Sequence, residues 1–125
     1  MDMVQQFHRT FQGYSQSAPT AQVPSQISAG RIAIFAEELA EYQAAVAAGD
    51  IVEVADALTD MLYVLLGTFI THGLQDKAVK LFAEVHRSNM SKLDKNGRPL
   101  YREDGKILKS ELFSAPDLAA IINRP

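Results

Sequence analysis

The chain has 125 residues, the usual size of one domain, and its 47% hydrophobic and 22% charged residues are near the globular average, which excludes a disordered chain. It has no cysteine, which excludes disulfides, thiolate zinc sites and a cysteine nucleophile and favours a cytoplasmic location. The net charge of −3 hides an asymmetry that suits a metal ion beside a polyphosphate: residues 37–60 hold seven acids and no Lys or Arg, and residues 86–109 hold seven cations against three acids.

Helical periodicity and turn residues predict an all-α chain, a single domain over residues 1–125 with four to five helices. The first helix is expected over residues 2–12, followed by a Ser- and Pro-containing loop over residues 14–27. The second begins at a Ser28 cap and ends at Gly49. Its apolar stripe should face the core, and consists of Ile32, Phe35, Leu39, Tyr42 and Val46.

Asp50 should cap a third helix over about residues 51–72, which is apolar around most of its circumference, as is typical of a central, fully packed helix. A fourth helix is expected over residues 75–89 and a short last one over residues 117–123. Residues 100–108 could form a small hairpin. The thin helical layers and the all-round apolar third helix predict a bundle completed by oligomerisation, as a homodimer or homotetramer.

Other partners are not expected. The N-terminus lacks the basic-then-apolar pattern of a signal peptide. The longest apolar run, residues 61–70, is too short for a bilayer span, so we expect no membrane partner. The acidic total and the lack of aromatic residues among the basic ones argue against nucleic acid.

The acids of the second and third helices should meet. The junction at residues 49–50 is too short for anything but a helical hairpin, so the two helices must run antiparallel. Glu41 and Asp56 then lie at nearly the same height, and Glu38 and Asp60 form a second level pair. At about 100° per residue, Glu53 falls within about 60° of both aspartates. We therefore expect five carboxylates to point into one gap.

These carboxylates need a counter-charge, because ionised carboxylates beside the apolar run after Asp60 are costly unless paired. Hard divalent cations meet this need with oxygen ligands, and Mg²⁺ is predicted, with Mn²⁺ as the alternative. The competing interpretation is a solvated acidic helix face. A di-iron bundle is disfavoured, because neither His72 nor His86 has Glu three residues before it.

At this point the residues resemble a known family. The EELAE run at residues 37–41, followed by acids on the next helix, is similar to the EExxE and ExxD motifs of the all-α nucleoside triphosphate pyrophosphohydrolases, such as MazG, dimeric dUTPase and phosphoribosyl-ATP pyrophosphohydrolase. Residues 55–64, 84–92 and 104–109 resemble the small MazG-like branch labelled phosphoribosyl-ATP pyrophosphohydrolase-like. The resemblance covers most of the chain.

The resemblance implies cleavage of the α–β phosphate bond of a (deoxy)nucleoside triphosphate, giving monophosphate and pyrophosphate. Carried over, Glu38, Glu41 and Asp60 would bind Mg²⁺, and Glu37 would bind metal or orient the attacking water, which makes Glu37 and Glu38 the catalytic candidates. One departure is Ala57, where the ExxD motif aligned on Asp60 needs an acid. Asp56, or an alternative Glu53-x-x-Asp56 motif, would have to supply that carboxylate.

Substrate contacts are expected outside the acidic hairpin. Basic groups should hold the phosphates, hydroxyl and amide groups should bind phosphate or sugar, and the family's N-terminal segment suggests that His8 contacts the base; each alone is as readily an ordinary surface or core residue. The candidates are His8, Arg87, Asn89, Ser91, Lys92 and Lys109.

We therefore expect a Mg²⁺-dependent nucleoside triphosphate pyrophosphohydrolase, acting in nucleotide-pool house-cleaning. The alternative is a non-catalytic helical module that senses metal or nucleotide.

Overall fold

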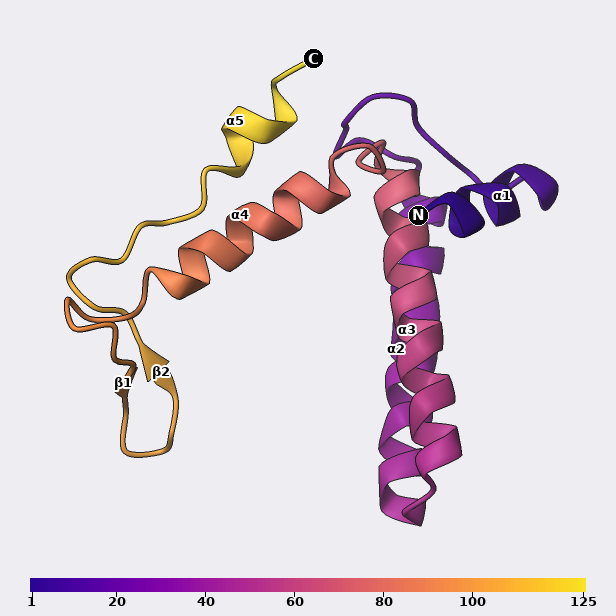
Figure 1. Ribbon diagram of the computed structural model, residues 1–125. Coiled ribbons are helices and arrows are strands. Elements are labelled where there is room, and N and C mark those ends of the chain that lie inside the picture. Colours follow the sequence, from indigo (N-terminus) through magenta and orange to yellow (C-terminus); the bar gives the residue numbers. More distant parts are fainter. The chain divides into compact units, whose positions relative to one another are not determined.

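The computed structural model describes all residues 1–125 and is mostly helical, which confirms the all-α prediction (Figure 1). The chain forms two compact units, Met1–Gln75 and Asp76–Pro125. The prediction of a single domain stays a prediction. The first unit holds α1 (Asp2–Thr10), α2 (Ser25–Ala48) and α3 (Ile51–Thr71); the second holds α4 (Ala78–Met90), β1 (Leu100–Tyr101), β2 (Ile107–Leu108) and α5 (Leu118–Ile122).

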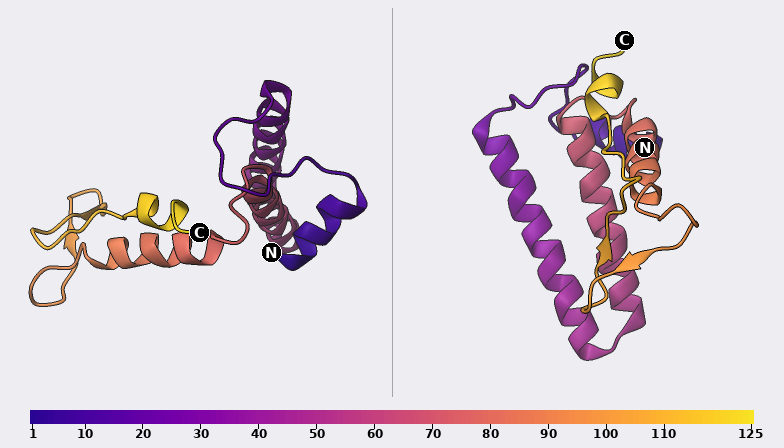
Figure 2. Two further views of the ribbon diagram at one scale, coloured as in Figure 1. Left: turned by 90° about the horizontal axis from the view of Figure 1, so that it is seen from above. Right: turned by 90° about the vertical axis from the view of Figure 1, so that its left-hand side faces the viewer.

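The first unit is built on the antiparallel α2–α3 hairpin, which Figures 1 and 2 show from different sides. Gly49 ends α2 with a left-handed φ of 67°, a conformation that glycine adopts without steric cost. Asp50 then caps α3, because its side chain accepts hydrogen bonds from the backbone N–H groups of Val52 and Glu53, at 2.9 and 3.2 Å. The predicted hairpin and both of its junction residues are confirmed.

The face that α2 turns toward α3 differs from the predicted stripe. Ala45 of α2 and Ala57 of α3 are buried, and Arg31 reaches across to donate hydrogen bonds to the Thr68 hydroxyl, at 3.0 Å, and the Val64 carbonyl, at 2.5 Å. The prediction that the whole stripe faces the core is wrong, because three of its members are largely exposed: Ile32, Leu39 and Val46. Alanine surrounds much of α2, so an apolar pattern alone does not single out one packing face.

The prediction that the third helix is fully packed is also wrong. Its buried residues lie on one side and include Gly67 and Ile70, whereas Leu58, Leu62 and Leu65 are about half exposed. Helix α3 is long and apolar enough to cross a membrane, as judged by its length and composition alone. Core helices of soluble proteins meet the same two criteria. The absence of a membrane partner stays a prediction. One side of α3 has no partner within the first unit.

The loop after α1 is tied to the C-terminal end of α3. Backbone N–H groups of Gln16 and Thr20 donate to the carbonyls of Ile70 and His72, at 3.1 and 3.0 Å. His72, the C-cap residue of α3, places its ring Nδ1 2.9 Å from the Thr20 carbonyl. Gly73 follows with φ 69° directly against the Ala18 backbone, where a Cβ atom would clash. The predicted loop is therefore an ordered strap.

Two helical glycines give a matched test of this packing. A Cβ atom at Gly67 would lie 2.7 Å from Arg31 Nη2 and 2.9 Å from His8 Nε2, whereas one at Gly30 would meet nothing within 4 Å. We expect Gly67→Ala to lower the free energy of unfolding by about 1–3 kcal/mol through overpacking. Gly30→Ala should raise it by up to about 1 kcal/mol, because alanine is the better helix former. Urea unfolding followed by circular dichroism measures both, and equal effects would contradict the described packing.

In the second unit, side chains of α4 hold the segment that follows the hairpin. Glu84 forms an ion pair with Arg87 at 2.8 Å and accepts a hydrogen bond from the Asp117 N–H at 2.9 Å. Arg87 also donates to the Ala115 carbonyl at 3.1 Å. Ser91 accepts from the Ser114 N–H at 2.8 Å. The predicted hairpin is confirmed over residues 100–108, and the last short helix is confirmed but is shorter than expected.

These contacts predict that the attachment of the Asp117 backbone to α4 depends on pH. The hydrogen bonds from Arg87, and then that from the Asp117 N–H, lower the pKa of Glu84 from 4.5 to about 2. A pKa lowered by folding gives stability that is present above pH 4.5 and is lost as pH falls toward 2. We expect the Asp117 amide to lose hydrogen-exchange protection over that range. In Glu84→Gln that protection should be low at every pH; an unchanged pH profile in the variant would contradict the assignment.

Candidate metal centre

Three of the predicted metal ligands meet across the α2–α3 hairpin. Carboxylate oxygens of Glu38, Glu41 and Asp60 lie within 4.8 Å of one another. Glu38 and Asp60 are half-buried and Glu41 is exposed, so the group opens to solvent on one side. The convergence follows from the hairpin, because residues equally far from the Gly49–Asp50 junction lie at the same height on antiparallel helices.

The electrostatics of this carboxylate cluster (Glu38, Glu41 and Asp60) are unfavourable without a cation. Glu38 Oε2 is buried and has no hydrogen-bond partner. Burial most of all, then the negative charges of Glu41 and Asp60, a side-chain hydrogen bond with Glu41 and the charge of Asp56, raise the pKa of Glu38. The ion pairs of the chain lie elsewhere, at residues 84–87 and 102–104. The cluster therefore lacks an ion-pair partner within the first unit.

The other two predicted ligands line a cavity beside the cluster. Glu53 and Asp56 share with Glu41 a hollow of about 290 Å³, whose remaining wall is alanine side chains. Ala57 is one of these and is only 3% exposed. This is the position where the ExxD motif would carry an acid, so the small side chain leaves open space where that motif would place a carboxylate. Glu41 belongs to both groups, and it joins the five predicted carboxylates into one region.

The residues present fit a hard divalent ion. All donors are carboxylate oxygens, which Mg²⁺ and Mn²⁺ prefer, and no thiolate or imidazole belongs to the cluster. The unpartnered Glu38 oxygen is the clearest indication, because buried polar atoms normally have a partner. Glu37, one residue earlier, is exposed and does not belong to the cluster.

Most predicted substrate contacts belong to the second unit, and two of them already have hydrogen-bond partners there. The Arg87 guanidinium makes two hydrogen bonds to Glu84, at 2.9 and 2.8 Å, and Ser91 Oγ donates to the Ser88 carbonyl at 2.6 Å. Lys109 lies over the Phe113 ring, 4.5 Å from its centroid. Asn89 is exposed and Lys92 is half-buried. Arg87 and Ser91 thus hold the fold of this unit whatever else they bind.

His8 belongs to the first unit and is buried, with 8% of its surface exposed. Burial is the main cause that lowers its pKa; the positive charge of Arg31 acts in the same direction, and the Tyr14 backbone opposes it. The imidazole is therefore neutral over most of the physiological range. Arg31, which lies beside it, was not among the predicted site residues, because one cation in an apolar helix gives no signal of its own.

A comparison of the sequence with family models finds a family that matches the part of the chain that holds these carboxylates. The model described as phosphoribosyl-ATP pyrophosphohydrolase matches residues 4–89, which include most of α1, the whole α2–α3 hairpin and all five carboxylates. The match ends before three of the predicted substrate-binding residues, Ser91, Lys92 and Lys109. No curated protein matches the chain.

Proposed function

Because the chain belongs to the phosphoribosyl-ATP pyrophosphohydrolase family, within the MazG-like superfamily, and is thus a hydrolase of pyrophosphate bonds, we propose that it cleaves the α–β bond of a (deoxy)nucleoside triphosphate with Mg²⁺. The observation that carries the proposal is the unpartnered, buried Glu38 oxygen within the carboxylate cluster. Such a group is tolerated when a cation completes it.

Each carboxylate has a proposed part in the reaction. Glu38, Glu41 and Asp60 would hold the ion, and Glu53 and Asp56 would complete its surroundings from the neighbouring cavity. When bound, Mg²⁺ supplies charge to the phosphoryl oxygens and lowers the pKa of water. Glu37 is exposed and free to orient the attacking water from the edge of the cluster.

The excess of positive charge over residues 86–109 also supports the proposal. Lys92 and Lys109 would neutralise the departing pyrophosphate, and Asn89 would donate hydrogen bonds to phosphate or sugar. Arg87 would contribute to the same field while it stays paired with Glu84. Nucleotide-pool house-cleaning in the cytoplasm is the role that we propose for this activity.

The proposal is tested with a panel of substrates. Purified chain with Mg²⁺ should release pyrophosphate from at least one nucleoside triphosphate or from phosphoribosyl-ATP, and chelation should stop the release. The second candidate is a non-catalytic module that binds metal or nucleotide, favoured by Ala57 in place of an acid. Tight nucleotide binding with no release from any substrate would select that candidate.

We also propose that two copies form a homodimer through the open side of the hairpin. Exposed apolar side chains of α3 recur at alternating spacings of four and three residues, the pattern of a helix–helix seam: Ile51, Ala55, Leu58, Leu62 and Leu65. At about 100° per residue this stripe lies opposite Asp60 on α3. On α2, Ile32, Leu39 and Val46 recur every seven residues and are also exposed. Two such hairpins would close a four-helix bundle without covering the carboxylates.

A further inference from the structure

Arg31 makes the hydrogen bonds that join α2 to α3 away from the Gly49–Asp50 junction. Its Nε donates to the Thr68 hydroxyl at 3.0 Å, and its Nη2 donates to the Val64 carbonyl at 2.5 Å. The Thr68 hydroxyl also donates to the Val64 carbonyl, at 2.8 Å, so the two acceptors are themselves joined. The guanidinium therefore ties α2 to two adjoining points of α3.

This guanidinium has no ion-pair partner within the first unit, because the ion pairs of the chain lie at residues 84–87 and 102–104. It occupies space that Gly67 leaves free, since a Cβ atom there would lie 2.7 Å from Nη2. Burial lowers the pKa of Arg31, and the group stays charged at neutral pH. A half-buried cation without an anion is costly, so its rigid fork of donors explains this residue better than its charge does.

Arg31 repeats the position of Glu38 about two turns earlier on α2. The two residues lie about 10 Å apart along the helix and within about 20° of each other around its axis. Gly67 and Asp60 are related in the same way on α3. Arg31 and Gly67 are therefore level with each other, as Glu38 and Asp60 are. The carboxylate cluster thus lies between two ties, the junction on one side and Arg31 on the other.

The two helices need a tie beyond the cluster, because they diverge away from the junction (Figure 2). Nearer the junction, the small buried side chains of Ala45 and Ala57 let the two backbones come close. At the cluster, the negative charges of Asp60 and Asp56 on α3 act against that of Glu38 on α2. Like charges on opposite helices push the helices apart. Without Arg31, this repulsion would widen the hairpin at the carboxylates.

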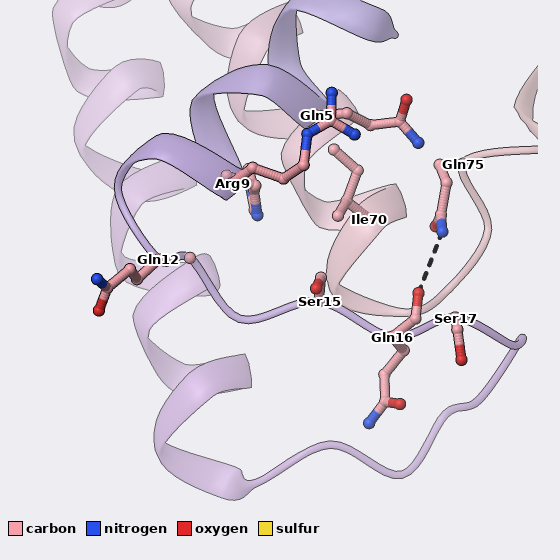
Figure 3. A pocket seen from close by; sticks show the side chains of 10 residues that line it. Gln5, Arg9, Gln12, Ser15, Gln16, Ser17, Ile70 and Gln75 are labelled. Carbon is pink, nitrogen blue, oxygen red and sulfur yellow. Dashed lines mark hydrogen bonds between the residues drawn. The ribbon is translucent and has the colours of Figure 1, made fainter.

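The strap after α1 does not replace this tie. Gln75, in the wall of a polar cavity of about 430 Å³, donates through Nε2 to the Gln16 carbonyl at 3.1 Å (Figure 3). The strap backbone also donates to the carbonyls of Ile70 and His72. These contacts bind the strap to α3 and to the turn that follows it, and none of them involves α2.

We propose that Arg31 is a positioning residue of the metal centre, whose hydrogen bonds to α3 hold Glu38 and Asp60 at the separation that one divalent ion needs. It acts through the two helices and not through its charge. A positive charge about 10 Å away would repel a divalent ion, and salt screens it over that distance. Loss of Arg31 should therefore weaken metal binding, whereas a role of its charge would give tighter binding. The proposal rests on the proposed function, because it concerns the ion of that function.

Binding of Mn²⁺ alone, without nucleotide, tests the proposal. Electron paramagnetic resonance of the free ion gives its dissociation constant. Arg31→Gln should weaken Mn²⁺ binding by about tenfold or more, the usual effect of losing a residue that orients metal ligands. Arg31→Lys keeps the charge but replaces the planar fork by one ammonium group, so it should weaken binding by about threefold. Circular dichroism at the same temperature should show the helix content of the unmodified chain in both variants.

Two further changes separate position from stability. Thr68→Val keeps Arg31 and removes one of its acceptors, so it should weaken Mn²⁺ binding by about threefold. Combined with Arg31→Gln it should cause no further loss, because both changes remove the same contact. Gln75→Ala is the matched control, because it removes a hydrogen bond of the strap at the same end of α3 without touching α2. Its Mn²⁺ affinity should equal that of the unmodified chain.

Unchanged or tighter Mn²⁺ binding in Arg31→Gln and Thr68→Val would overturn the proposal, as would an equal weakening in Gln75→Ala. Absence of Mn²⁺ binding to the unmodified chain would overturn it together with the metal centre. Binding that depends on Arg31, in a chain that releases no pyrophosphate from any substrate, would remove the proposed function and leave the positioning role. Pyrophosphate release with unchanged Mn²⁺ affinity in both Arg31 variants would do the reverse.

Discussion

Asp60→Asn should lower Mg²⁺-dependent pyrophosphate release by about 100-fold or more while leaving the fold intact. Asp60 supplies one of three converging oxygen donors, and an amide oxygen carries no charge to hold the ion. Metal-assisted stabilisation of a transition state is worth several kcal/mol, and each 1.36 kcal/mol is about tenfold in rate. Initial rates at saturating substrate over a Mg²⁺ titration measure the loss.

The same substitution should not reduce stability in the absence of metal. Asp60 is one of the charges that raise the pKa of Glu38, so removing it relieves repulsion within the cluster. We therefore expect an unchanged or higher melting temperature in EDTA, together with a smaller gain when Mg²⁺ is added. Asp76→Asn is the control, because Asp76 is exposed and lies outside the cluster. Full activity in Asp60→Asn would refute the metal assignment.

The part of the site that the sequence predicted well is the part that one short junction determines. Gly49 and Asp50 leave no room for any connection but a tight hairpin, so counting residues from that junction places Glu38 level with Asp60. The same count does not decide which acids come closest. The structure brings Glu41 to that pair and leaves Glu53 and Asp56 along the adjoining cavity.

What could not be predicted depends on contacts between residues far apart in the chain. Arg87 reads as a free cation in the sequence, yet it pairs with Glu84 and binds the Ala115 carbonyl 28 residues later. The polar cavity depends on a strap with no periodic pattern, which places Gln16 against Gln75. The apolar residues of α3 were predicted to be buried, but the sequence does not say whether a partner within the chain or a second copy covers them.

Leu62→Glu should convert the homodimer into a monomer. Leu62 belongs to the α3 stripe and is 54% exposed in the single chain, so a charge there is solvated in the monomer and buried without a partner in the dimer. Loss of a central apolar contact and burial of that charge should weaken association by at least about 100-fold, or about 2.7 kcal/mol. Sedimentation equilibrium should give twice the chain mass of 13.7 kDa for the unmodified protein and the single mass for the variant.

Val79→Glu is the matched control for this change. Val79 of α4 is 83% exposed and lies outside the hairpin, so the same gain of negative charge should leave the dimer intact. Circular dichroism should show equal helix content in both variants, because each side chain is exposed within its own unit. A monomeric unmodified protein at tens of micromolar, or a Leu62→Glu variant that still sediments as a dimer, would show that the stripe is not the interface. In either case the carboxylate cluster, whose Asp60 lies on the opposite side of α3 from the stripe, would still be free to bind metal, because the dimer contact and the cluster share no residue.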